Sequence, residues 1–261
     1  MDTNLTDKIA VVTGASKGIG LAISQALAAA GAHVIAGARH NSAEIQALEQ
    51  AGSATFVTAD LSTADGPKAL IASAAQRGGV DILVNNTGAV TPRFDGILSV
   101  SDDDWLASVA VNFLSAVRTT REAIPHMLSR GGGSIVMIGS VNATLPEWNI
   151  VDYSATKAAL ANFTKSVSKE FGRKGIRVNT ISPGPVATPL WLAEGGMAHQ
   201  FAAVSGATPD QVVDSVVAGS STGRFTQPEE VAALAVFLAG ELAANITGSD
   251  IRIDGGYVAT V

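Results

Sequence analysis

The chain has 261 residues, of which 47% are hydrophobic and 15% charged, and its formal net charge is −6. This length suits one large α/β domain, and the hydrophobic share excludes a disordered chain. The acidic balance argues against a nucleic-acid-binding protein, which normally presents a basic face. The sequence contains no cysteine, which excludes disulfides, thiolate metal sites and a cysteine nucleophile.

Metal, membrane and export signals are also missing from the sequence. Four scattered histidines and the lack of an HExxH pattern leave a zinc mechanism without ligands, so we expect no metal site. No basic segment followed by an apolar core opens the chain, and the longest apolar runs stop short of the roughly 18 residues that a membrane span needs. We therefore expect a soluble cytoplasmic protein with neither nucleic-acid nor membrane partners.

Short β-branched runs alternate with alanine- and leucine-rich helical stretches along the whole chain. This alternation predicts strands at 9–13, 33–37, 54–59, 82–85, 134–138, 177–181 and 250–253. It predicts helices at 19–30, 42–51, 62–77, 101–129, 153–172 and 228–240. Several strands are apolar at successive positions, as strands buried on both faces are. We expect an α/β fold, doubly wound in three layers around a seven-stranded parallel sheet, as a single domain over residues 1–261.

The segment from Pro183 to about Thr226 interrupts this alternation of strands and helices. It contains two short helical pieces among glycine, proline and serine residues that favour turns. A long excursion inside a compact α/β domain is typical of a functional segment. We expect a substrate lid at about 189–222, with Gly195 and Gly196 suited to a hinge.

A glycine-rich loop connects the first predicted strand to the first helix, with the sequence Thr13-Gly14-Ala15-Ser16-Lys17-Gly18-Ile19-Gly20. Glycine allows a tight turn, and it lets backbone N–H groups approach a pyrophosphate at the helix N-terminus, where the dipole favours anions. Glycine triplets also mark ordinary strand-to-helix turns. The position of this one inside a βαβ unit favours dinucleotide binding.

The Gly-x-x-x-Gly-x-Gly spacing resembles that of the short-chain dehydrogenase/reductase family, and the likeness covers almost the whole chain. Further marks of the family follow in order: Asp60-Leu61, Asn85-Asn86-Thr87-Gly88, Asn112, Ser140, Tyr153 with Lys157, the stretch from Pro183 to Thr188, and Asp254-Gly255-Gly256. The family usually has alanine where this chain has Thr87, which predicts a small adjustment of that turn. The resemblance implies a Rossmann fold and hydride transfer between a nicotinamide cofactor and a ketone or secondary alcohol.

The resemblance also implies which residues bind the cofactor. They are Gly14, Ser16, Lys17, Gly18, Ile19, Gly20, Arg39, Asp60, Leu61, Asn86, Gly88, Tyr153, Lys157, Pro183, Gly184, Val186 and Thr188. Enzymes that use NAD usually place an acid at the end of the second strand, where this chain has Ala38. Arg39 follows it, and Lys17 lies in the glycine loop. Two such cations suit a 2′-phosphate, so we expect NADP(H), although both could simply be solvated surface cations.

The predicted catalytic residues are Asn112, Ser140, Tyr153 and Lys157. Tyr153 and Lys157 are four residues apart and share one face of a helix. The Lys157 ammonium favours the Tyr153 phenolate and lowers its pKa toward the working pH, which acid–base chemistry requires. Ser140, at the end of a strand, can donate a hydrogen bond to the substrate oxygen.

The resemblance assigns two further roles: Lys157 bonds the nicotinamide ribose, and the backbone of Asn112 holds a water in a proton relay. Each residue also has an ordinary interpretation when taken alone. Tyr153 and Lys157 resemble a surface pair, Ser140 a turn cap, and Asn112 a solvated helix residue. Their joint occurrence at the family's spacing favours catalysis.

Large apolar side chains gather in the expected lid, at Leu190, Trp191, Leu192, Met197 and Phe201. They suit a small-molecule carbonyl or alcohol substrate that is mostly apolar. Alternatively, Trp191 and Phe201 pack the lid onto the body or onto a neighbouring subunit.

Three other interpretations stay open. The chain is similar to the 3-oxoacyl-carrier-protein reductases of the family, so an acyl carrier protein is a second candidate partner, with Arg130, Arg173 and Lys174 as candidate contacts. A non-catalytic NADP(H) sensor or scaffold is another, although such proteins lose the tyrosine or the lysine. The resemblance also suggests a homotetramer, with the helices at 101–129 and 153–172 between subunits.

Overall fold

The computed structural model describes residues 3–260, and within them seven parallel strands form one sheet in the order β3-β2-β1-β4-β5-β6-β7. The strands are β1 (Ile9–Thr13), β2 (His33–Ala38), β3 (Ala54–Thr58), β4 (Ile82–Asn85), β5 (Gly133–Ile138), β6 (Ile176–Pro183) and β7 (Asp250–Ile253). The chain builds outward from β1 to β3 and then returns to pair β4 with the other side of β1. The carboxyl ends of β1 and β4 therefore border the crevice where doubly wound sheets bind ligands.

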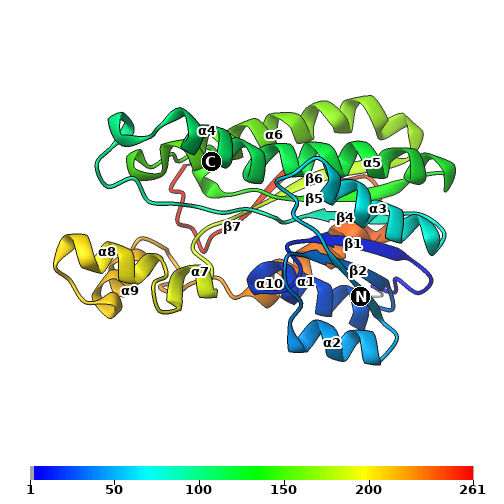
Figure 1. The fold of residues 1–261 in the computed structure, drawn as a ribbon, viewed down its shortest axis with the longest axis horizontal. Coiled ribbons are helices and arrows are strands. Elements are labelled where there is room, and N and C mark those ends of the chain that lie inside the picture. Colours follow the sequence, from blue (N-terminus) through cyan, green and yellow to red (C-terminus); the bar gives the residue numbers. More distant parts are fainter. Residues whose placement is uncertain (1–2, 261) are drawn as a thin grey trace.

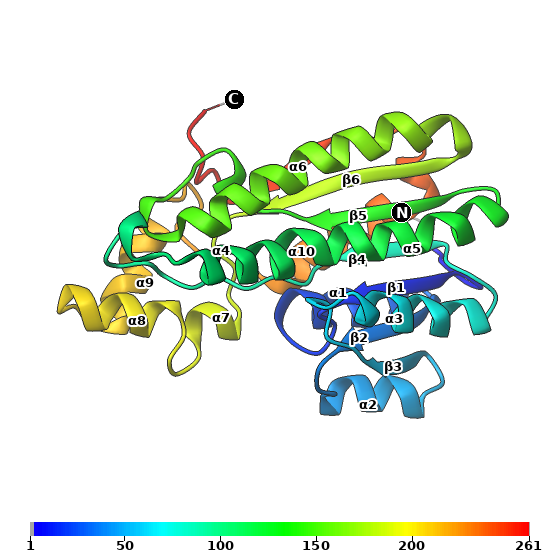
Figure 2. The same cartoon turned by 45° about the horizontal axis from the view of Figure 1, so that its top comes forward.

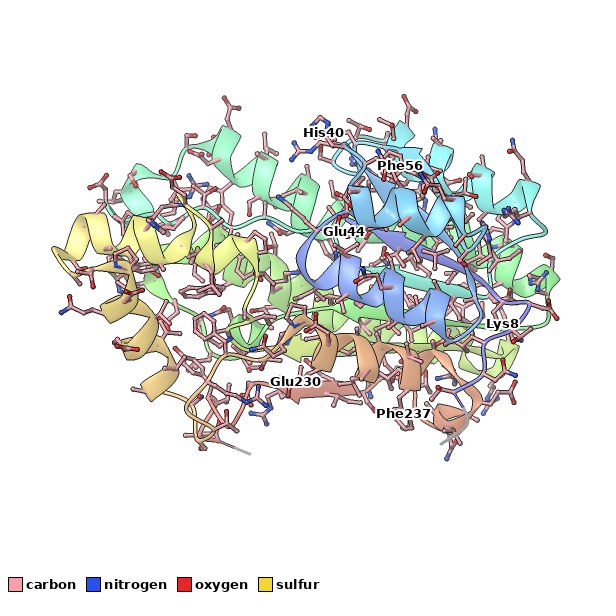
Figure 3. All side chains as sticks on the ribbon, turned by 90° about the horizontal axis from the view of Figure 1, so that it is seen from below. Lys8, His40, Glu44, Phe56, Glu230 and Phe237 are labelled. Carbon is pink, nitrogen blue, oxygen red and sulfur yellow. The ribbon has the colours of Figure 1, made fainter. Side chains whose placement is uncertain are left out.

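Helices cover both faces of the sheet, as Figures 1 and 2 show. One face carries α1 (Gly18–Ala29), α2 (Ala43–Gln50) and α10 (Pro228–Ala239). Figure 3 looks onto this face, with Glu44 labelled on α2 and Glu230 on α10. The other face carries α3 (Asp65–Gln76), α4 (Asp102–Val109), α5 (Ser115–Ser129) and α6 (Val151–Phe171). This arrangement confirms the predicted three-layer Rossmann fold.

Two apolar cores lie between the sheet and its helices. In β1, Ala10 and Val12 join the core under α1 and α10, whereas Ile9 and Val11 join the core under α3 and α5. A strand buried on both faces must be apolar at successive positions, which explains its sequence.

The predicted elements match the structure with small differences at their ends. Strand β6 runs two residues past the predicted 177–181, because Ser182 and Pro183 still pair with Arg252 and Ile253 of β7. The predicted helix 101–129 is not uniform: a π-helical turn, Ala110–Leu114, separates α4 from α5. The predicted helix 153–172 begins earlier, at Val151, which places Tyr153 in its first turn.

The segment between Pro183 and Thr226, all of which the structure describes, contains three helices where the sequence predicted two. They are α7 (Pro189–Leu192), α8 (Met197–Ser205) and α9 (Pro209–Ala218). A capping box between Thr208 and Gln211 begins α9, and the four-residue α7 is too short for a periodic signal. These helices pack chiefly on one another and stand out from one end of the sheet in Figure 1. Among residues 3–260, no helix has the length and hydropathy to cross a membrane.

Candidate active site

The glycine loop wraps the carboxyl end of β1. Gly14 and Gly18 have φ angles of +65° and +54°, a conformation that side chains with a Cβ rarely adopt. A Cβ at Gly20 would collide with the carbonyl oxygen of Gly14 and the Asn86 side chain. All three glycines are thus required by the backbone path, and they leave the N-terminus of α1 open to an anion.

Asn86, directly after β4, supports this loop. Its Nδ2 donates to the carbonyl oxygens of Thr13 at 3.0 Å and Gly14 at 3.2 Å. The backbone N–H groups of Asn86 and Thr87 both donate to the Thr13 hydroxyl, at 2.8 and 3.0 Å. Thr87 fits beside Gly14, where a Cβ would lie 3.2 Å from the Thr87 hydroxyl. The sequence-predicted Asn86 therefore shapes the loop.

The predicted 2′-phosphate contacts lie on neighbouring strand ends. Arg39 directly follows β2 and is exposed, and Lys17 is exposed as the N-cap residue of α1. The loop is tied to β2 by a hydrogen bond from Ala15 N to Gly37 O at 3.1 Å. Hydrogen bonds from Ser62 lower the pKa of Asp60, and the charge of Arg39 adds to this effect. The structure thus brings Arg39 and Asp60 to one edge of the crevice.

Gly88, Asn112 and Lys157 meet at the centre of the site. A Cβ at Gly88 would lie 3.1 Å from Asn112 Oδ1 and 3.5 Å from Lys157 Nζ. Asn112 Oδ1 accepts a hydrogen bond from the backbone N–H of Ala89 at 2.9 Å. Asn112 lies inside the π turn, and such turns are frequent at functional sites because they perturb the helical hydrogen-bond ladder.

Lys157 is buried under Tyr153. Its Nζ donates to the carbonyl oxygen of Ile138 at 2.9 Å and lies 5.5 Å from the centre of the Tyr153 ring. Only 3% of Lys157 is exposed, and burial lowers its pKa from 10.5 to about 8. At neutral pH the group is therefore still mostly an ammonium.

Tyr153 faces Ser140 across the site. Burial raises the pKa of Tyr153, and a hydrogen bond with Ser140 opposes this rise. The Ser140 hydroxyl also donates to Asn142 Oδ1 at 3.0 Å and accepts from the backbone N–H of Asn142 at 3.1 Å. Asn142 in turn donates from Nδ2 to Leu145 O at 3.0 Å. No sequence pattern singles out Asn142, which holds the Ser140 hydroxyl in place.

The segment after β6 completes the crevice. The Gly184 N–H donates to Ile253 O at 3.1 Å, and a Cβ on Gly184 would lie 2.9 Å from that of Asp254. Farther along, the Thr188 side chain packs against the Gly18 position. The other predicted contacts lie along the same rim: Ser16 and Ile19 are half-buried, and Leu61, Pro183 and Val186 are buried.

Four aromatic rings join the expected lid to the body. Trp191 stacks on Phe201 at 6.5 Å and meets Phe225 at 5.5 Å between ring centres. Phe201 meets the edge of Phe94 at 5.3 Å, and Phe94 belongs to the segment between β4 and α4. Trp191 and Phe201 thus pack the lid onto the body, as the second interpretation held, whereas Leu190 and Leu192 stay exposed.

The cations suggested for a carrier protein lie elsewhere. Arg130 precedes β5 and pairs with Asp81 at 2.7 Å, and Arg173 and Lys174 precede β6. The amino ends of parallel strands share one edge of the sheet, opposite the carboxyl ends where the crevice lies. Within one chain, these three candidate contacts therefore do not line the crevice.

The structure also joins three charged residues that the sequence did not indicate. Arg93 pairs with Asp104 and with Asp152, the residue before Tyr153. A buried acid needs a partner, and Arg93 provides it for Asp152.

These features fit a dinucleotide. The glycines leave a cradle that a Cβ would fill, and within the described chain the Lys17 side chain does not cap the first turn of α1. Helix N-termini of this kind bind pyrophosphate.

Known proteins resemble this chain over nearly its full length. A family model described as enoyl-(acyl carrier protein) reductase matches residues 14–258. The D-beta-hydroxybutyrate dehydrogenase of Rhizobium meliloti (strain 1021) is 36% identical over 260 residues, covering 97% of this chain and 99% of that protein. The Homo sapiens dehydrogenase/reductase SDR family member 4 is 32% identical over 261 residues, covering 97% and 88%.

A solved structure agrees with these relatives. The crystal structure of L-sorbose reductase from Gluconobacter frateurii, complexed with NADPH and L-sorbose, superimposes with a TM-score of 0.91 at 35% identity and covers 100% of both chains. Matches of 32–36% identity along nearly all of each chain are too extensive for a shared fold alone. The chain belongs to the short-chain dehydrogenase/reductase family.

Proposed function

We propose that this chain is an NADP(H)-dependent oxidoreductase that interconverts a ketone and a secondary alcohol. The observation that carries the proposal is the meeting of Tyr153, Lys157, Ser140 and Asn112 beside the glycine loop. The L-sorbose reductase structure, which holds NADPH, supports the choice of cofactor. The exposed cations Arg39 and Lys17 support it as well.

The chain's own residues hold the cofactor and move the proton. The glycine loop and α1 receive the pyrophosphate, Arg39 and Lys17 the 2′-phosphate, and Lys157 the nicotinamide ribose. When bound, the cofactor supplies or accepts the hydride. In reduction Tyr153 gives its phenolic proton to the substrate oxygen, while the Ser140 hydroxyl turns its proton from Asn142 Oδ1 and donates a hydrogen bond to the same substrate atom. Lys157 stabilises the phenolate by its charge, and Asn112 links Lys157 to solvent.

The substrate is a small carbonyl compound with a mostly apolar body. Leu145 and Trp148, between Ser140 and Tyr153, and Leu190 and Leu192 of the lid are all exposed apolar side chains. Such residues favour apolar ligands at a site mouth. The ring contact of Phe201 with Phe94 holds the lid, residues 189–222, against the segment after β4.

A panel of substrates tests this function. NADPH oxidation is measured with diacetyl and L-sorbose, and NADP⁺ reduction with D-beta-hydroxybutyrate. An acetoacetyl thioester tests the carrier-protein alternative. We expect turnover with at least one ketone, and less than about a tenth of it in the matched Tyr153→Phe variant. Cofactor binding without turnover on any of them would favour the sensor alternative.

The enzyme is a homotetramer in this proposal. A shallow groove between α5 and α6 is lined by Val117, Ile124, Pro125, Phe163 and Phe171, and apolar surface of this kind favours association. Light scattering is expected to give four times the chain mass of 26.4 kDa. A Val117→Arg variant should lower that mass, and a monomeric parent protein would contradict the proposal.

A further inference from the structure

Arg93, in the segment between β4 and α4, binds two carboxylates at once. Its Nη1 lies 2.9 Å from Asp104 Oδ1, and its Nη2 lies 2.9 Å from Asp152 Oδ2. The Arg93 side chain is 14% exposed and that of Asp152 3%, so water screens this pair little. The hydrogen bond to Asp152 is also the main reason why the pKa of Arg93 is raised.

The backbone at Arg93 is held to the same turn. Its N–H donates to the carbonyl oxygen of Asn149 at 2.6 Å, three residues before Asp152. The next residue, Phe94, carries the ring contact with Phe201 of the lid. The segment after β4 is thus joined to the lid on one side and to the residue before Tyr153 on the other.

Stabilisation of the fold does not by itself explain this ion pair. Arg93 Nε and Asp152 Oδ1 are buried and, within residues 3–260, have no hydrogen-bond partner. Removing two charges from water costs free energy that a pair with unsatisfied atoms recovers only in part. A buried carboxylate beside the acid–base residue therefore calls for a functional reason.

Few other charges surround the first turn of α6, and the one just before it in the chain is Glu147, which precedes the short helix Trp148–Ile150 packed on α6. Lys157 lies on α6 itself, one helical turn after Tyr153. Among the elements of residues 3–260 that pack closely on α6, α4 contributes Asp102, Asp103 and Asp104. The cations Arg173 and Lys174 and the β6 residue Arg177 lie at the other end of the helix. Arg93 is thus the cation that neutralises Asp152.

We propose that Arg93 is a positioning residue of the active site, which neutralises the buried carboxylate of Asp152 and fixes the first turn of α6 so that Tyr153 can ionise. This inference rests on the proposed role of Tyr153 as the acid–base group. Without Arg93, the Asp152 charge would oppose formation of the Tyr153 phenolate, since a like charge disfavours ionisation. Without the Asp152 charge, Arg93 would favour it.

The chain allows a direct measurement, because it contains only two tyrosines, Tyr153 and Tyr257. In a Tyr257→Phe parent labelled at the tyrosine ζ carbon, one NMR signal reports the ionisation of Tyr153 in the full chain without any substrate. We expect Arg93→Met to raise the titration midpoint by roughly one pH unit and Asp152→Asn to lower it. The double variant Arg93→Met with Asp152→Asn should titrate near the parent value.

Controls separate this charge effect from a general loss of structure. Arg130→Met removes another, more exposed arginine–aspartate pair at the opposite edge of the sheet and should leave the midpoint unchanged. Arg93→Lys keeps the charge and should largely restore the midpoint. Circular dichroism defines the pH range in which each variant is folded, and Asp152→Asn alone carries the test if Arg93→Met does not fold.

Two results would overturn the inference: an unchanged midpoint in the folded single variants, or a shift in Arg93→Met that persists in the double variant. The titration measures the ionisation of Tyr153 and not turnover. Its result can therefore contradict the role of Arg93 without contradicting the proposed function. A Tyr153→Phe variant that stays active would refute the function, whatever the titration shows.

Discussion

The amino group of Lys157 lies over the face of the Tyr153 ring, 5.5 Å from its centre. Burial acts on the two groups in opposite directions, lowering the pKa of Lys157 to about 8 and raising that of Tyr153. The free protein therefore loses the Lys157 cation at a pH below that at which Tyr153 ionises. Near neutral pH, where Lys157 is still mostly cationic, its charge favours the Tyr153 phenolate in the function proposed above.

Replacing Tyr153 by phenylalanine should abolish most turnover while keeping the fold and cofactor binding. The ring fills the same space, but the phenolic proton is lost, and general acid–base catalysis contributes about 10²–10⁴-fold. Steady-state kinetics and a fluorescence titration with NADPH measure the two effects separately. Retention of more than about a tenth of the activity would exclude this role for Tyr153.

Lys157→Met should stabilise the free protein at neutral pH while it impairs function. The lysine pKa falls from 10.5 to about 8 on folding, so below pH 8 both states are protonated and burial of the ammonium costs stability. We expect a gain of about 1–3 kcal/mol in the free energy of unfolding. The gain should shrink as the pH rises from about 8 toward 10.5, because the wild-type lysine then becomes neutral when folded.

Urea denaturation across this pH range checks the stability of Lys157→Met. The same variant should bind NADP⁺ more weakly, and its residual activity should peak at higher pH, since the charge that favours the phenolate is gone. An unchanged pH profile of that activity would separate the ribose contact of Lys157 from its effect on Tyr153.

Arg39→Ala should weaken NADPH binding by about ten- to a hundredfold and leave NADH binding little changed. A charge-assisted hydrogen bond to the 2′-phosphate is lost. Part of the effect should fade at high salt, because Arg39 is exposed. Arg77→Ala removes an exposed cation at the end of α3 and serves as the control. Equal efficiency of the wild type with NADH and NADPH would refute the assignment.

Ala38→Asp tests the same assignment from the other side. Ala38 is the last residue of β2, where an acid repels the 2′-phosphate and offers the 2′-hydroxyl of NAD an acceptor. Combined with Arg39→Ala, it should reverse the preference toward NADH. Steady-state kinetics with both cofactors measure the reversal, and a double variant that still prefers NADPH would place the phosphate contacts elsewhere.

Residues 189–222 should exchange amide hydrogens faster in the free protein than with NADP⁺ and a substrate bound. Apart from the ring contacts of Trp191 with Phe225 and of Phe201 with Phe94, the helices of this segment pack chiefly on one another, which favours local opening. Hydrogen exchange followed by mass spectrometry measures the change, with α10 as an internal reference. Equally slow exchange in both states would indicate a fixed contact and not a lid.

The sequence was sufficient for the sheet and for the residues that cluster around Lys157. Successive apolar residues in β1 and β4 and the glycines of the first loop are local signals, each caused by the backbone path at that position. These signals predict a parallel sheet. In such a sheet the segments that follow the strands begin at the carboxyl edge, so Ser140 and Tyr153 must both lie there. The family resemblance then connected them to chemistry.

Other parts of the site leave no local signal. Arg93 and Asp152 are 59 positions apart, and neither belongs to a motif or a periodic pattern. Asn142 resembles any polar turn residue until Ser140 is seen to donate to it. The π turn at 110–114 is also invisible to a helical period, because one extra residue changes the phase without changing the composition.

That π turn makes helices α4 and α5 mechanically interdependent. The turn adds a residue between the two helices. Helix α4 holds Asp104 against Arg93, whereas α5 and α6 line the shallow apolar groove proposed as a subunit contact. Deleting one residue there would rotate one helix by about 100° relative to the other. Protein chimeras should therefore exchange residues 102–129 as a single block. A junction inside this block would misplace either Asp104 relative to Arg93 or the face of α5 that lines the groove.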